Sequence, residues 1–157
     1  MTTDILRRPD VANIQEFYTR SPSSGFFVLE YDNRIIGLIA IDASENSQSG
    51  DSKTTQEKDV SSTATIRHMY VEDPFRNADV LDDLVAFATG HAFTASSDVK
   101  EIKATSSILG YVHKSLRSCK FTTDGVVERI GVYRWKIQAM SLKREQWEQA
   151  REKGAST

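Results

Sequence analysis

Hydrophobic positions recur along the first part of the chain with two different periods. Residues 10–20 place apolar side chains at helical spacing, with Asp10 as the N-cap candidate, and predict one short helix. Two β-rich runs follow at 26–31 and 35–41, and the turn residues 32–34 join them. This pattern predicts a helix followed by a β-hairpin.

The rest of the chain alternates strands with helices. The predicted elements are a strand at 64–71, a helix at 79–94, a strand at 99–105, a short helix at 110–118, strands at 126–130 and 132–140, and a charged C-terminal helix. A strand-helix-strand unit requires parallel strands, whereas hairpins require antiparallel ones. The order therefore predicts an α/β (α+β) fold, in which helices flank one mixed central sheet.

Two segments differ from this domain in composition. Residues 44–62 are polar, with Val60 as their only large apolar side chain, and we predict a flexible insertion between two strands. The insertion is either a loop without a function or a partner-binding segment that is regulated through its Ser and Thr residues. Residues 143–157 form a charged helix and tail, which leaves 1–142 as the domain.

Composition excludes several classes of partner. The chain has 157 residues, 20 basic and 22 acidic side chains and a net charge of -2, so we expect no nucleic-acid partner. The longest apolar run, 35–41, is far shorter than the roughly 18 residues of a membrane-spanning helix. We therefore expect a cytoplasmic chain that does not insert into a membrane. Cys119, the only cysteine, is interpreted as a packed apolar side chain rather than a reactive thiol.

Two stretches carry a resemblance to a known family. FFVLEYDNRIIGLIAI at 26–41, ATIRHMYVEDPFRN at 64–77 and the helix that follows resemble the GNAT superfamily of acetyl-CoA-dependent N-acetyltransferases. The resemblance covers roughly residues 10–140 and implies a GNAT-like sheet. Only nine residues precede the first predicted helix, so we expect the first strand of that fold to be lacking.

The resemblance also implies a place for the cofactor. Family members bind pyrophosphate with a loop of the form R/Q-x-x-G-x-G/A, whose backbone N–H groups lie at a helix N-terminus. Here the loop retains Arg76, while Asp79 and Leu81 occupy the two small positions. We expect Leu81 to obstruct the pyrophosphate, and Asp79 to repel it by roughly 4 kcal/mol at about 4 Å and an effective dielectric near 20. Asp79 is equally suited to cap the helix.

These departures lead us to expect no cofactor. If acetyl-CoA binding survives, the resemblance assigns it to Val71, Arg76 and Asn77.

No catalytic residue can be assigned. Many family members carry a tyrosine acid shortly before a Gly-Phe pair; alignment on Phe121 puts Lys120 at the glycine and Leu116 at the tyrosine. Leucine cannot donate a proton, and Tyr111 lies more than one helical turn away. No motif for metal binding, serine hydrolysis or nucleotide triphosphate hydrolysis is present.

Five residues are candidates for a general base. His68 lies on a predicted strand, where a structural role is favoured over catalysis. For His91, His113, Glu30 and Glu72 we favour surface or structural roles.

The preferred hypothesis is a non-catalytic, acetyltransferase-like domain that binds a protein partner or client. The alternative is a divergent acetyl-CoA-dependent N-acetyltransferase acting on an amine. Within the superfamily the closest resemblance is to membrane-bound cysteine-conjugate N-acetyltransferases, through DVANIQEFYTR, FFVLE and HMYV. The polar insertion is typical of fungal proteins, and the chain is also similar to a fungal endoplasmic-reticulum packaging factor for an inorganic phosphate transporter. That resemblance implies the cytosolic face of the endoplasmic reticulum and a membrane tether in a longer protein. Candidate interfaces are the sheet edge, the terminal helix with Trp147, and residues 44–62.

Overall fold

Six strands form one mixed sheet in a computed structural model that describes residues 9–44, 60–107, 109–132 and 135–156. The strands are β1 (Gly25–Tyr31), β2 (Arg34–Ser44), β3 (Val60–Val71), β4 (Glu101–Thr105), β5 (Thr122–Ile130) and β6 (Trp135–Lys143). Their order in the sheet is β1-β2-β3-β4-β6-β5. Only β3 and β4 pair in parallel; the other neighbouring strands of this sheet pair antiparallel. The predicted fold class is therefore confirmed.

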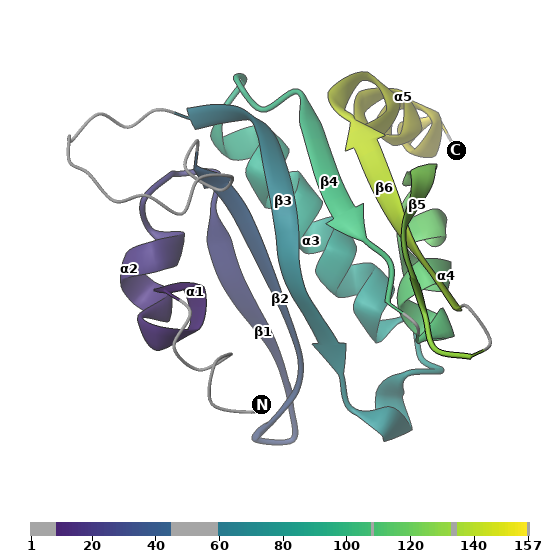
Figure 1. Ribbon diagram of the computed structural model, residues 1–157. Coiled ribbons are helices and arrows are strands. Elements are labelled where there is room, and N and C mark those ends of the chain that lie inside the picture. The colour runs from purple at the N-terminus through teal and green to yellow at the C-terminus, as the bar shows by residue number, and fades with distance from the viewer. Residues whose placement is uncertain (1–8, 45–59, 108, 133–134, 157) are drawn as a thin grey trace.

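Helices cover both faces of the sheet (Figure 1). They are α1 (Pro9–Ala12), α2 (Ile14–Tyr18), α3 (Val80–Ala95), α4 (Gly110–Ser118) and α5 (Arg144–Ala155), with the 3-10 helix η3 (Asp73–Phe75) between β3 and α3. Helices α1 and α2 lie on one face, and α3 and α4 lie on the other. Alternate residues of β2, which include Ile39, Ile41 and Ala43, pack in the core with α3. The residues between them, such as Asp42, face α1 and α2.

The N-terminal helix is divided, contrary to the single helix predicted for residues 10–20. Asn13 lies between α1 and α2, and its side-chain oxygen accepts the backbone N–H of Glu16 at 3.2 Å. A side chain that takes this N–H ends one helix and caps the next. The cap is therefore Asn13, and the predicted cap Asp10 lies inside α1.

The strands on either side of the predicted insertion are longer than expected. Ser44 is the last residue of β2, and β3 begins at Val60, so both ends of the 44–62 segment belong to strands. Residues 45–59 lie outside the described part of the chain, as does Tyr133 at the start of the last predicted strand.

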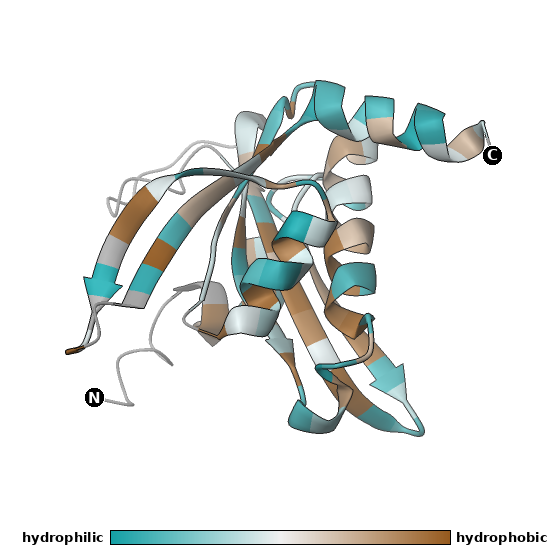
Figure 2. Cartoon of the chain, turned by 90° about the vertical axis from the view of Figure 1, so that its right-hand side faces the viewer, coloured by the Kyte–Doolittle hydropathy of each residue, from teal (hydrophilic) through white to brown (hydrophobic). Residues whose placement is uncertain are grey.

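Helix α5 is attached to the domain through its first turns. The Arg144 guanidinium donates to the carbonyl oxygens of Val99 at 2.8 Å and Ser96 at 2.6 Å. The Trp147 ring lies 5.1 Å from that of Phe93. The helix is largely hydrophilic and projects beyond α3 (Figure 2). The proposed division between 1–142 and 143–157 stays a prediction.

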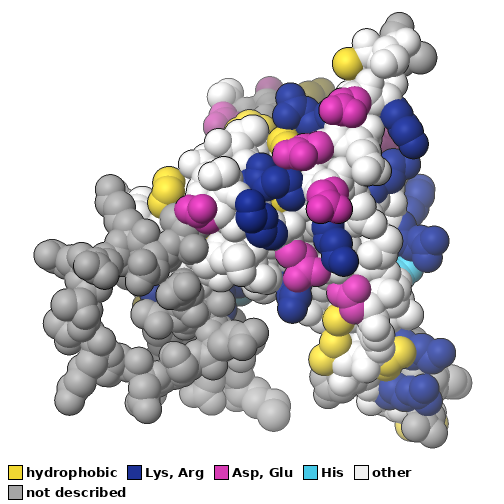
Figure 3. Space-filling view, turned by 90° about the horizontal axis from the view of Figure 1, so that it is seen from above, with side chains coloured by type: hydrophobic (Ala, Val, Ile, Leu, Met, Phe, Trp, Pro, Cys, Tyr) yellow, Lys and Arg dark blue, Asp and Glu magenta, His cyan; other side chains and the backbone are white. Residues whose placement is uncertain are grey.

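The face that carries α5 has side chains of both charges. Figure 3 shows basic and acidic side chains interspersed over the centre of this view. In addition, none of the helices described here combines the length and the apolar character needed to cross a membrane.

Lys120 follows α4 in a backbone conformation that usually requires glycine. Its φ is 72°, and its N–H donates to the carbonyl of Arg117 at 3.0 Å. The next N–H, of Phe121, donates to the carbonyl of Leu116 at 3.0 Å. Lysine therefore occupies the left-handed position of a helix C-terminal motif, which is the place of the glycine in the alignment on Phe121.

We predict that Lys120→Gly raises the free energy of unfolding by about 0.5–1 kcal/mol, because glycine adopts positive φ without strain. Urea denaturation measures the change. The matched control is Lys114→Gly within α4, which should lower the free energy of unfolding by about 1 kcal/mol. A Lys120→Gly variant that is less stable than the parent would contradict this account.

Candidate active site

The two central strands separate after a short parallel pairing. β3 pairs with β4 only from Thr63 to Thr65. Beyond this point β4 continues along β6, where Ser106 N–H donates to the carbonyl of Gln138 at 2.9 Å. Residues 66–71 of β3 therefore face no strand on that side within the described chain, and Figure 1 shows the two strands diverging. We call this opening the β3–β4 split.

In the loop after β3, the side chain of Arg76 bonds to neighbouring residues of the same loop and strand. The Nε of Arg76 donates to the carbonyl of Val71 at 2.9 Å, and the guanidinium pairs with Asp73. The same guanidinium lies 4.7 Å from the centre of the Tyr111 ring. Asn77 is exposed. The structure thus brings the three predicted cofactor residues to the end of the split, but the Val71 carbonyl and the Arg76 charge already have partners.

The first turn of α3, at the same end of the sheet, has backbone N–H groups that donate no hydrogen bond among those of the described residues. Asp79 is the N-cap residue, but its side chain makes no capping hydrogen bond. Among the hydrogen bonds of the described residues, none uses the N–H groups of Leu81 or Asp82. Free N–H groups at a helix N-terminus are suited to bind an anion.

The expectation that Leu81 obstructs this turn is wrong. Its side chain is 4% exposed and belongs to the core beneath α3. Asp79 is exposed to solvent, where a dielectric near 80 is appropriate. The repulsion between Asp79 and a phosphate at about 4 Å is then about 1 kcal/mol rather than 4.

A β-bulge places two polar side chains in a groove on the opposite face. Ile41 pairs with Ile66 and Ala40 pairs with His68, which leaves Arg67 as the extra residue of β3. Arg67 and His68 consequently both line a groove of about 420 Å³. The remaining lining residues are Val11, Ile14, Phe26, Leu38, Met69 and Tyr70.

Solved structures share this arrangement of strands and helices, although no protein-family model and no curated protein matches the sequence. A GNAT-family acetyltransferase from Streptococcus pneumoniae has a TM-score of 0.65 at 12% identity, over 85% of this chain and 74% of that one. The ribosomal-protein-alanine N-acetyltransferase of Brucella melitensis has a TM-score of 0.60 at 15% identity, over 84% and 75%. The fold is that of the GNAT acetyltransferases.

A third GNAT structure corrects the expectation of no cofactor. The putative acetyltransferase yncA from Salmonella typhimurium, solved with its cofactor acetyl-CoA, has a TM-score of 0.60 at 16% identity, over 85% of this chain and 70% of that one. A chain with the same fold therefore holds the cofactor. The expectation rested on Leu81 and Asp79, and the positions of both side chains remove most of its physical basis.

The five candidate bases are dispersed over the GNAT fold. Among them only His68 lines the groove beside the split. Glu30 is exposed, and Glu72 pairs with Arg34 at 3.0 Å. His91 contacts the carbonyl of Ser24 at 3.1 Å. His113 lies on α4. The β-bulge that places His68 in the groove could not be predicted from the alternation of apolar and polar residues in the strand.

The position of the family's tyrosine holds no proton donor. Leu116 is fully buried in the core. Tyr111, at the start of α4, instead contacts Arg76 at the end of the split. The structure thus brings together two residues that are 35 positions apart in the sequence, which local spacing could not indicate.

Cys119 has the environment of an unreactive thiol. Burial raises the pKa of its thiol from 9.0 to about 11, and the carboxylates of Asp82 and Asp83 contribute to the rise in pKa. The Sγ atom donates to the carbonyl of Asp82 at 3.5 Å. These contacts support the interpretation of Cys119 as a packed side chain.

We predict that iodoacetamide alkylates the native chain at pH 8.5 at least about tenfold more slowly than the urea-unfolded chain. The raised pKa keeps the thiol protonated in the native state, and only the thiolate reacts. The native rate should rise as the pH approaches 11. Because Cys119 is the only thiol, mass spectrometry follows a single reaction, and equal rates in the two states would contradict the prediction.

Proposed function

We propose that the chain is an acetyl-CoA-dependent N-acetyltransferase that acts on an amine. The observation that carries this proposal is the β3–β4 split, with free backbone donors of α3 at its end and His68 in a groove beside it. A divided pair of central strands exposes backbone groups that would otherwise pair with each other, so the fold offers them to a ligand. This is the enzymatic alternative of the two hypotheses that the sequence raised.

The residues beside the split fit acetyl-CoA through their main chain. The N–H groups of Leu81 and Asp82 are suited to the diphosphate, with Asn77 exposed beside them. When bound, acetyl-CoA supplies an acetyl group activated as a thioester. Residues 72–83 contain five carboxylates and one guanidinium, so we expect weaker binding than in a loop of glycines.

His68 is the proposed general base. An amine must lose a proton as its nitrogen forms a bond to an acyl carbon, and an imidazole accepts a proton readily near neutral pH. The apolar side chains around His68 would also favour the uncharged, nucleophilic form of an amine. As the C–N bond forms, the C–S bond of the thioester would break, and the leaving thiolate would take its proton from water, because Leu116 has none to donate.

A second candidate function is a protein-interaction domain, which the edge of the sheet favours. β1 is one of the two edge strands of the described sheet, and Val28 and Tyr31 on it are 50% and 63% exposed. An exposed apolar edge strand can pair with another chain. Assistance in the export of a phosphate transporter at the endoplasmic reticulum stays a prediction. An assay of acetyl transfer to an amine distinguishes the two candidate functions, because an interaction domain does not require this activity.

Acetyl-CoA should bind with a dissociation constant in the micromolar to submillimolar range, measured by isothermal titration calorimetry. Asp79→Asn should lower that constant about fivefold at low salt, since it removes a carboxylate next to the free N–H groups. Glu152→Gln, a carboxylate change on distant α5, is the matched control and should have no effect. Absence of heat at millimolar acetyl-CoA would refute the proposal.

His68→Gln should reduce acetyl transfer to an acceptor amine by about 10²–10³-fold while acetyl-CoA affinity stays unchanged, because an amide side chain cannot accept the proton of the amine. The free thiol released from acetyl-CoA reports the rate. His113→Gln is the control histidine and should retain the parent rate. If His68→Gln is as active as the parent, another group is the base.

A further inference from the structure

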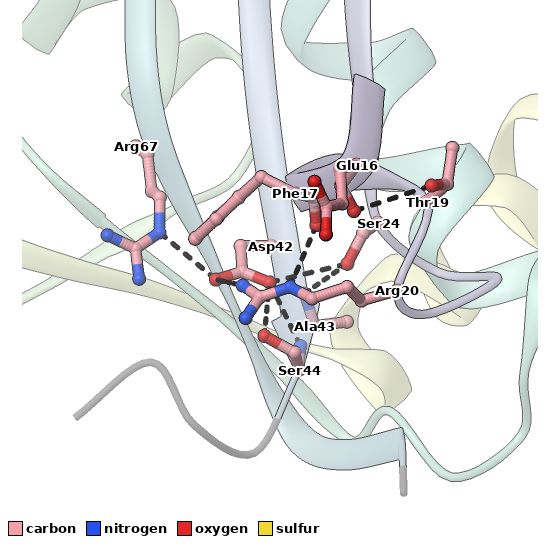
Figure 4. A network of polar contacts seen from close by, with 9 residues as sticks. All are labelled: Glu16, Phe17, Thr19, Arg20, Ser24, Asp42, Ala43, Ser44 and Arg67. Carbon is pink, nitrogen blue, oxygen red and sulfur yellow. Dashed lines mark hydrogen bonds and ion pairs between the residues drawn. The ribbon is translucent and has the colours of Figure 1, made fainter. Parts of the chain in front are cut away.

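A buried carboxylate is the centre of a polar cluster beside the groove. Asp42 is 0% exposed, and its carboxylate accepts the Nε of Arg67 at 3.1 Å. It also accepts the N–H of Ser44 at 3.0 Å, the hydroxyl of Ser44 at 2.7 Å and the hydroxyl of Ser24 at 3.4 Å. The Nη2 atom of Arg20 lies 3.9 Å away (Figure 4). These bonds fix both the carboxylate and the guanidinium of Arg67.

The cluster carries more positive than negative charge. Two guanidiniums, of Arg20 and Arg67, share the single carboxylate of Asp42. In the described part of the chain, the hydrogen bonds and ion pairs of Arg67 use only its Nε atom. Its two Nη groups remain as donors, on a side chain that is 26% exposed and lines the groove. A partly buried guanidinium fixed in this way is suited to bind a carboxylate.

The β-bulge connects this donor to the proposed base. Without the extra residue, Arg67 and His68 would point to opposite faces of the sheet. With it, both line one groove, from consecutive positions whose Cα atoms are about 3.8 Å apart. Apolar side chains, including Ile14, Phe26 and Leu38, form the rest of the lining. The groove therefore combines a base, a fixed cation and an apolar wall.

We propose that Arg67 determines acceptor specificity by binding a carboxylate on the amine substrate. This inference rests on the proposed acetyl transfer and names its substrate class: an amine that also carries a carboxylate and an apolar group. Asp42 is a positioning residue, because it orients Arg67 from a fully buried site. The same charge disfavours polyamines, because the guanidinium would repel their additional ammonium groups.

The test uses carboxylate-bearing amines and their neutral amides. The acceptors are phenylalanine, 4-aminobutyrate and 6-aminohexanoate, each compared with its amide, and spermidine. For at least one pair, we expect kcat/KM for the acid to exceed that for the amide by tenfold or more, with spermidine the poorest acceptor. Equal kcat/KM within every pair overturns the proposal.

Arg67 is then changed in two ways. Removing it alone leaves the buried Asp42 with Arg20, at 3.9 Å, as its remaining counter-charge, so the double variant Arg67→Met, Asp42→Asn removes both charges together. This variant should lose the tenfold preference, whereas Arg67→Lys should keep part of it. The control Arg34→Met removes a guanidinium that pairs with Glu72 and does not line the groove; it should keep the whole preference. A double variant that folds and keeps the preference overturns the proposal.

A binding measurement separates this inference from the acetyl transfer itself. Calorimetry without coenzyme compares the N-acetyl acids, which retain the carboxylate, with their amides. Selective binding of an acid that depends on Arg67 supports the carboxylate site even if acetyl-CoA does not bind and no transfer occurs. If none of the acids binds more tightly than its amide, the site is refuted, whatever the result with acetyl-CoA.

Discussion

The loss of pairing between β3 and β4 is the constraint on which the rest of the site depends. Three residues of each strand pair, and then β4 remains with β6 while β3 remains with β2. Backbone N–H and C=O groups that leave a sheet need other partners. One of them, the Val71 carbonyl, is satisfied by Arg76. The opening therefore has a polar edge inside an otherwise apolar domain, and this edge makes the fold suited to bind an extended ligand.

The β-bulge at Arg67 determines the site on the other face of the sheet, where α1 and α2 lie. It changes which side chains of β3 face α1 and α2, and so it brings Arg67 next to His68. Asp42 on β2 then neutralises part of the charge and holds Arg67 in place. The split and the bulge lie on the same strand, so one segment of β3 forms both the backbone edge and the side-chain groove. A change in the register of β3 would disturb both sites together.

The sequence predicted the positions of helices and strands better than it predicted strand pairing and side-chain contacts. The period of the apolar positions placed every strand of the sheet and predicted α4 with its observed bounds. The split could not be predicted, because it follows from the pairing of β4 with a strand some 35 residues later. Leu81 shows a different limit. In the pyrophosphate-binding motif of the GNAT superfamily, Leu81 stands where a small residue would lie beside the phosphate. The helical spacing of the apolar residues in α3 nevertheless directs its side chain into the core, and this spacing was visible in the sequence. The first helix is divided where the side-chain oxygen of Asn13 accepts the backbone N–H of Glu16, a local bond that competes with a weak helical signal.

The end of the split and the groove carry opposite charges, and this difference affects how strongly each would bind an anionic ligand. Residues 72–83, at the end of the split, are acidic, whereas the groove is lined by the guanidinium of Arg67, which pairs with the buried carboxylate of Asp42. In the proposed reaction the acyl donor carries phosphates and would meet the acidic end, where main-chain donors act against nearby carboxylates. An acceptor with a carboxylate would meet the fixed guanidinium, where little reorganisation is needed. Under this proposal, the electrostatic selection is stronger for the acceptor than for the donor. Because Arg67 is fixed by a buried carboxylate while Asp79 lies in solvent, this difference should persist at salt concentrations that screen the acidic loop.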